Sequence, residues 1–148
     1  MRYEKEIGKK VWLLDGSRER GFELKNTETY TLKEVKLGKD CGTPWENRFV
    51  LERDSDGETL EVGEYNVIFA LIGDNIHEYL GFNDVYAEVS TNSIGVVSVN
   101  IEWGDWKHEH LWCKDLMGYI GYKEIGSDVT EEDDSDCYSA IHYFLKVA

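Results

Sequence analysis

The segment RFVLERDSDGETLEV, residues 48–62, gives the strongest indication of how this chain folds. The turn Asp54-Ser55-Asp56-Gly57 lies between residues 48–53 and residues 58–62. The Asp-Gly pair supplies the positive φ that a tight turn between two strands requires. The segment therefore predicts a β-hairpin made of residues 48–53 and 58–62.

Other segments before residue 105 also predict strands that pair antiparallel. The apolar run 65–72, bounded by Gly63 and Gly73, predicts a central strand covered on both faces. The remaining expected strands are 10–14 with 21–24, 27–37, and a second hairpin made of 85–89 and 94–103.

Two segments nearer the C-terminus have the spacing of an amphipathic helix. One is 111–120, and the other follows Thr130, where Cys137, Ala140, Ile141, Phe144 and Leu145 repeat at helical intervals. The aromatic and β-branched residues of 136–147 also favour a strand, so that alternative stays open. We expect an α+β fold, mainly an antiparallel sheet of about six to eight strands with one or two C-terminal helices packed on it.

The length and composition predict one globular domain over residues 1–148, with a minor seam near 38–46 around the single proline, Pro44. A hydrophobic content of 41% is too high for a disordered acidic tail. The short apolar run 11–14 and three widely spaced cysteines predict a cytoplasmic protein without a signal peptide, membrane span or disulfide framework.

The negative charge of the chain is concentrated in one part of the sequence. Residues 1–50 contain 11 Lys and Arg and 9 Asp and Glu, whereas residues 51–148 contain 5 and 21. No Lys or Arg occurs between Arg53 and Lys107. Such a field repels nucleic acid and attracts basic protein surfaces, so we expect no direct binding of nucleic acid.

We expect two groups of acidic residues, one near residues 54–64 and one near 131–136, to contact a basic surface of a partner protein. Trp106 is the expected exposed aromatic anchor beside them. The alternatives are an ordinary hairpin turn for the first group of acids and a solvated helix N-terminus for the second. Trp103 and Trp112 fit core positions. The expected partner-binding acids are Asp54, Asp56, Glu58, Glu61 and Glu64, followed by Glu131, Glu132, Asp133, Asp134 and Asp136.

His108, His110 and Cys113 are the best candidates for metal binding or catalysis, because imidazole and thiolate are preferred zinc ligands. No fourth ligand is indicated by spacing, and we expect surface histidines beside a core cysteine. The sequence contains no phosphate-binding glycine loop and no hydrolase or metalloprotease motif. We therefore expect no cofactor, no bound metal and no enzymatic activity.

This composition resembles that of small acidic proteins of phages and mobile elements, such as anti-restriction and anti-CRISPR proteins. The resemblance implies an inhibitor that occupies the basic surface of a nucleic-acid-binding protein or nuclease. An immunity protein that neutralises a nuclease toxin is an alternative with the same chemistry. A small metalloprotein or enzyme using His108, His110 and Cys113, or a scaffold component without a discrete target, are further alternatives.

Overall fold

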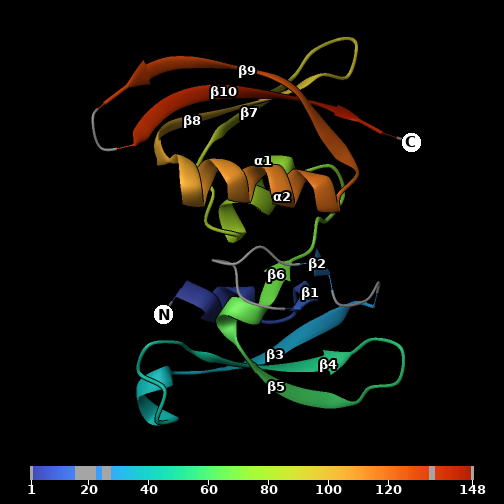
Figure 1. Ribbon diagram of the computed structural model, residues 1–148. Helices are drawn as coiled ribbons and strands as arrows, with labels where there is room; N and C mark the ends of the chain where they lie inside the picture. The colour runs from blue at the N-terminus through green and yellow to red at the C-terminus, as the bar shows by residue number, and fades with distance from the viewer. Residues whose placement is uncertain (1, 16–22, 25–27, 134–135, 148) are drawn as a thin grey trace. The chain divides into compact units, whose positions relative to one another are not determined.

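The computed structural model describes residues 2–15, 23–24, 28–133 and 136–147 (Figure 1). The chain divides into two compact units, Met1–Ile72 and Gly73–Ala148. The first unit contains a six-stranded sheet and the second a four-stranded sheet, and all the strand pairs described are antiparallel. With two α-helices beside the sheets, the expected α+β class is confirmed.

The sheet of the first unit has the order β2-β1-β3-β4-β5, and β6 pairs with β1. Its core is formed by alternate residues of these strands, with Val11, Leu32 and Leu51 fully buried. The strands are β1 (Lys10–Asp15), β2 (Glu23–Leu24), β3 (Tyr30–Lys36), β4 (Arg48–Arg53), β5 (Thr59–Gly63) and β6 (Val67–Phe69). Short 3₁₀ helices are η1 (Arg2–Glu6), η3 (Gly38–Asp40) and η4 (Glu64–Asn66).

The hairpin expected at residues 48–62 is present as β4 and β5, paired from Arg48↔Gly63 to Glu52↔Thr59. Gly57 has a φ of 77°, which is the left-handed conformation that the turn requires. Phe49 and Leu51 are buried on one face of the strand, whereas Val50 between them is only partly buried. The expected strand at 10–14 and its partner strand are also present as β1 and β2.

The strand predicted at 65–72 is present and buried, but it is shorter than expected and is not central in the sheet. Only Val67–Phe69 forms a strand, β6, and among the described residues it pairs with β1 alone, so it is not central. All three of its residues are buried, whereas Tyr65 and Ile72 are about half exposed. The apolar run therefore indicated a buried segment correctly. An apolar run has no periodicity that would reveal how much of it forms a strand.

The turn around Pro44, where we expected a minor seam, lies within the first unit. The Thr43 N–H donates to the Gly38 carbonyl at 2.9 Å, and the Gly38 N–H donates to Oδ1 of Asn47 at 3.0 Å. These hydrogen bonds close the loop locally between β3 and β4. That the chain behaves as a single domain stays a prediction.

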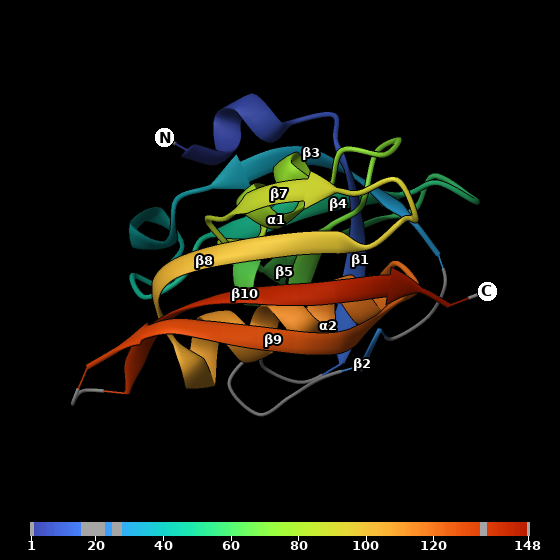
Figure 2. The ribbon, with the colours of Figure 1, turned by 90° about the horizontal axis from the view of Figure 1, so that it is seen from above.

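The sheet of the second unit has the order β7-β8-β10-β9, and α1 and α2 lie behind it in Figure 2. The buried residues of β8, β10 and the two helices form its core, with Val99, Leu116 and Phe144 almost fully buried. The elements are α1 (Ile76–Phe82), β7 (Glu88–Thr91), β8 (Val97–Asp105), the π-helix η5 (Trp106–His110), α2 (Leu111–Tyr119), β9 (Tyr122–Glu132) and β10 (Cys137–Lys146).

Helix α2 confirms the expectation at 111–120, and β7 and β8 confirm the second hairpin, with both strands displaced along the sequence. Helix α1 was not expected. Its N-cap is Asn75, whose side-chain oxygen accepts a hydrogen bond from the Glu78 N–H at 3.0 Å. Tyr79 and Leu80 of this short helix are almost fully buried.

The helix predicted after Thr130 is wrong, and the strand alternative for residues 136–147 is correct. Residues 137–146 form β10, which pairs with β8 on one side and β9 on the other. Ala140, His142 and Phe144 are buried while Ile141 and Tyr143 between them are less so, which is the period of a strand. The acids expected at a helix N-terminus therefore lie at the β9–β10 connection.

Within the described residues, no helix has the length and apolar character needed to cross a membrane.

Candidate functional site

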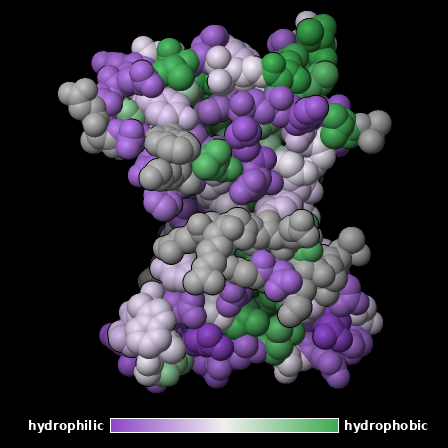
Figure 3. Space-filling model, viewed as in Figure 1, coloured by the Kyte–Doolittle hydropathy of each residue, from purple (hydrophilic) through white to green (hydrophobic). Residues whose placement is uncertain are grey.

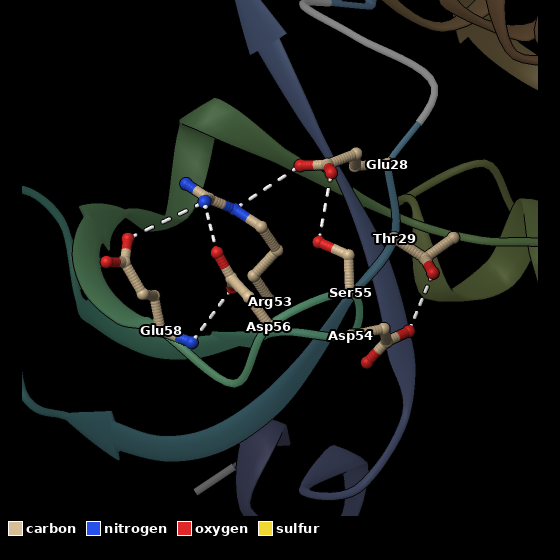
Figure 4. A network of polar contacts seen from close by, with 7 residues as sticks. All are labelled: Glu28, Thr29, Arg53, Asp54, Ser55, Asp56 and Glu58. Atoms are coloured by element: carbon tan, nitrogen blue, oxygen red, sulfur yellow. Dashed lines mark hydrogen bonds and ion pairs between the residues drawn. The ribbon is translucent and has the colours of Figure 1, made fainter.

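Asp54, the first of the predicted partner-binding acids, is held by contacts within the first unit (Figure 4). Its carboxylate accepts hydrogen bonds from Thr29 at 2.6 Å and Thr31 at 2.7 Å, and it lies 3.0 Å from Nζ of Lys10. The two threonine hydroxyls, and then Lys10, lower the pKa of Asp54 to about 2. This carboxylate therefore stabilises the hairpin.

Asp56 and Glu58 lie beside Arg53 at the end of the same hairpin (Figure 4). Nη1 of Arg53 is 2.9 Å from Asp56 and 3.5 Å from Glu58, and Asp56 also accepts a hydrogen bond from the Glu58 N–H. That hydrogen bond and Arg53 lower the pKa of Asp56. One guanidinium thus compensates much of the charge at this turn.

Glu61 and Glu64 also have partners within the first unit. Glu61 lies 3.0 Å from Nζ of Lys36, and Glu64 accepts a hydrogen bond from the Asn47 N–H at 2.9 Å. The acids predicted at 54–64 therefore all make contacts within their own unit, four of them with Lys or Arg. They are weaker candidates for an unbalanced acidic surface than the sequence alone indicated.

The charge imbalance is concentrated in the second unit. Residues 73–148 contain 15 Asp and Glu but only four Lys and Arg, whereas residues 1–72 contain 15 and 12. The second unit therefore carries −11 of the net charge of −14. On the face shown in Figure 3, hydrophilic side chains cover much of this unit between separate apolar patches.

The acids at the β9–β10 connection form the most concentrated part of this surface. We call Glu131, Glu132, Asp133 and Asp136 the hairpin acids. All four are exposed, and among the described residues no ion pair involves Glu131, Glu132 or Asp136. Asp134, also predicted to bind a partner, lies outside the described residues.

Three of the hairpin acids line a hollow of about 420 Å³ at this end of the sheet. Its other lining residues are Val129, Cys137 and Tyr138. The Tyr138 ring is stacked on the His110 ring, with 4.0 Å between the centroids and 14° between the planes. Carboxylates around an aromatic ring are complementary in charge to a Lys or Arg side chain.

The tryptophan predictions have mixed outcomes. The backbone of Trp106 belongs to the π-helix η5, but its side chain lies outside the described structure. Trp112 is partly buried and donates from Nε1 to the Asn83 carbonyl at 2.6 Å. Trp103 is not a core residue, because it lies where the β8–β10 register shifts, with a φ of 55° and 47% of its surface exposed.

The structure separates the three candidate ligands near the start of α2. His108 is exposed, while His110 and Cys113 are buried, with 1% and 0% of their surfaces accessible. Burial raises the pKa of the Cys113 thiol to about 12, which disfavours the reactive thiolate. No group of three or more His, Cys, Asp and Glu side chains in the described residues is arranged to hold a metal ion.

A buried histidine pair beneath the sheet was not predicted from the sequence. Nδ1 of His110 is 2.6 Å from Nε2 of His142, and Nδ1 of His142 is 3.1 Å from a carboxylate oxygen of Glu124. Nε2 of His110 is 3.1 Å from the carbonyl oxygens of both Gly104 and Tyr138. Spacing could not reveal this pair, because its two histidines are 32 positions apart.

Both ends of this chain of contacts are hydrogen-bond acceptors. For every contact to be a hydrogen bond, the two rings need three protons, whereas two neutral imidazoles carry two. Burial lowers the pKa of His142, while the nearby Glu124 carboxylate opposes this effect. His110 and, more weakly, Lys114 also disfavour a charge on His142. The network thus links η5, β9 and β10. Because burial disfavours the third proton, one of its contacts lacks a hydrogen when both rings are neutral.

No protein-family model, curated protein or solved structure matches this chain.

Proposed function

We propose that this chain is a non-catalytic binding protein whose second unit occupies a basic, nucleic-acid-binding surface of a partner protein. The observation that carries the proposal is the charge of that unit, 15 carboxylates against four Lys and Arg. A chain that needed only solubility could intersperse both signs, as the first unit does.

The exposed hairpin acids support this choice of surface over the acids at 54–64. Among the described residues Glu131, Glu132 and Asp136 form no ion pair, so their exposed carboxylates keep their field toward solvent and can accept hydrogen bonds from Lys or Arg of a partner. By contrast, Asp54 and Glu61 each lie 3.0 Å from a lysine nitrogen of their own unit. The proposed contact therefore centres on the β9–β10 connection.

The inhibitory mechanism is competition with a polyanion. Closely spaced carboxylates present negative charges to the same Lys and Arg side chains that would otherwise contact phosphates. A field of one sign accelerates encounter with a basic surface, and salt at physiological concentration screens it over about 8 Å. The partner would lose access to nucleic acid while this chain occupies its binding surface.

Two kinds of protein use this chemistry. One is an anti-defence inhibitor of a phage or mobile element, and the other is an immunity protein that neutralises a nuclease toxin. We favour the anti-defence inhibitor. We place the function in the cytoplasm, because the three cysteines are free thiols and Cys41 is exposed. Genes neighbouring that of this chain would distinguish the two biological settings.

The first test is capture of partners from a lysate of the native host at low and at high salt. The bait is compared with a hairpin-tip variant, Glu132→Lys, Asp133→Lys and Asp136→Asn. A matched control, Asp15→Lys, Glu34→Lys and Asp40→Asn, makes the same charge change at exposed acids of the first unit.

The expected result is a nucleic-acid-binding protein that is captured at low salt by the wild type and the control variant, and much less by the hairpin-tip variant. Partners that bind all three baits equally at both salt concentrations would contradict the proposed surface.

A further inference from the structure

The strand β9 forms an edge of the second unit's sheet. It contains 11 residues, Tyr122–Glu132, and among the described strands it pairs only with β10 (Figure 2). A strand at an edge presents backbone N–H and C=O groups that can pair with another strand. An edge strand this long is a ready template for such pairing.

The side chains of β9 are unusual for an unpaired edge. Ile125 and Val129 have 56% and 52% of their surfaces exposed, and the strand contains no proline. Of the features that commonly protect an edge strand, β9 is neither short nor interrupted by proline, and it has one lysine, Lys123, and two register shifts against β10. Two exposed β-branched residues four positions apart instead indicate a surface that a second strand can cover.

The sequence of β9 is complementary to itself when it is reversed about Ser127. In an antiparallel pair centred on Ser127, Lys123 of one strand lies opposite Glu131 of the other, and Ile125 lies opposite Val129. By symmetry each of these pairs occurs twice. Opposite charges and β-branched residues directly across an antiparallel ladder both stabilise it.

We propose that β9 pairs with β9 of a second copy of this chain about a two-fold axis at Ser127. The two four-stranded sheets would then form one continuous sheet, with the exposed side chains of Ile125 and Val129 covered at the junction. This inference does not rest on the proposed function, because it involves the edge of β9 and a second copy of the chain; of the hairpin acids, Glu131 alone belongs to both surfaces.

The pairing of β9 with β10 is compatible with this arrangement. From Gly126 to Val129 the register is uninterrupted, with Ser127 opposite His142 and Val129 opposite Ala140. Residues directly opposite share a face of the sheet, so Ser127 and Val129 face the same side as these buried residues. On either side the register shifts, at Ile125 and at Thr130, so the regular alternation is confined to residues 126–129, the stretch that contains the two-fold axis at Ser127.

The charge of the second unit determines how salt affects this dimer. Two units of −11 each repel one another, and salt screens that repulsion. The two Lys123–Glu131 pairs offset only part of this long-range repulsion, because they are exposed. Dimerisation should therefore strengthen as salt increases, whereas attraction to a basic partner should weaken.

The test is sedimentation-velocity ultracentrifugation of the full chain over a range of protein and salt concentrations. Lys123→Glu and Glu131→Lys should each raise the dimer dissociation constant about tenfold, because each turns two attractive pairs into two repulsive ones. The double variant restores opposite charges and should recover most of the affinity. Val129→Lys should leave the chain monomeric.

Glu88→Lys is the matched control, because it makes the charge change of Glu131→Lys at an exposed residue of the opposite edge strand, β7. It should not weaken the dimer. The proposal is overturned if the wild type is monomeric at all concentrations, if the dimer is insensitive to the β9 substitutions, or if the double variant is no tighter than the single ones. Circular dichroism establishes that each variant is folded.

Discussion

The side chains of His110 and His142 contact one another inside the second unit, with 2.6 Å between Nδ1 of the first and Nε2 of the second. One residue precedes α2 and the other lies in the middle of β10, so the contact joins the helix layer to the sheet. Glu124 of β9 completes the network from the other side of His142. Protonation of this histidine network should therefore affect the stability of the whole second unit.

The first prediction is that stability falls as the pH is lowered through the range in which free histidine titrates. Burial lowers the pKa of His142 from 6.5, so below that pH the unfolded chain binds a proton more readily than the folded chain. The stabilisation is complete above about pH 6.5 and is lost as the pH falls toward the lower folded pKa.

Urea unfolding of the wild type and His142→Asn between about pH 7.5 and 5.5 measures this effect. The wild type should lose more unfolding free energy over this interval than the variant. Equal or greater stability of the wild type at the lower pH would contradict the prediction. NMR titration of the ring provides an independent measurement.

The second prediction concerns Asp54. Asp54→Ala removes two threonine hydrogen bonds and the contact with Lys10, and we expect it to destabilise the first unit by about 1–2 kcal/mol. Glu58→Ala, in the same hairpin, removes only an exposed ion pair and should cost less than about 0.5 kcal/mol. Denaturant unfolding compares the two variants, and equal effects would show that the threonine contacts contribute little.

The lowered pKa of Asp54 predicts a second pH range in which the stability of the chain changes. This pKa is lowered to about 2 from 3.8, so the contribution of the carboxylate is complete above pH 3.8 and is lost as the pH falls through about 2. In Asp54→Ala this part of the acid dependence should be absent. A variant with the same acid unfolding profile as the wild type would be inconsistent with this carboxylate's role.

The third prediction tests the packing of α1 against α2. The Tyr79 hydroxyl is buried and donates to the Leu116 carbonyl at 2.7 Å. Tyr79→Phe should lower the unfolding free energy by about 1 kcal/mol, because a buried hydrogen bond is lost without a change in shape. The matched change Tyr86→Phe, at a side chain 68% exposed, should have no measurable effect.

The sequence was sufficient to predict elements whose signals are local. The β4–β5 hairpin is specified by the Asp56-Gly57 turn, and α2 by apolar spacing over residues 111–120. Helix α1 was missed because its seven residues are too few to establish a period. Its N-cap, Asn75, was the only local signal available.

The prediction for β10 failed because its residues satisfy two periods at once. Ala140 and Phe144 are spaced as on a helix face, but together with His142 they also alternate as in a strand. Pairing with β8 and β9 on both sides decided between them, and that information is not local. The His110–His142 contact depends on the same long-range pairing.

The fourth prediction is that the isolated chain does not bind nucleic acid. The basic residues that could allow binding are few, and Lys10 among them is engaged with Asp54 at 3.0 Å. Lys9 is the other described candidate, while Arg18 and Arg20 lie outside the described residues. Fluorescence anisotropy with duplex and single-stranded DNA at physiological salt should show no binding, and micromolar affinity would contradict the account.

The most direct test of the central claim is the association rate between this chain and the partner identified by capture, measured by stopped flow across a salt series. The wild type and the first-unit control variant should associate rapidly at low salt and slow steeply as salt increases. The hairpin-tip variant, folded by circular dichroism, should associate more slowly and depend less on salt. If all three proteins associate at the same rate at every salt concentration, the acidic surface of the second unit does not mediate binding and the proposed function is wrong.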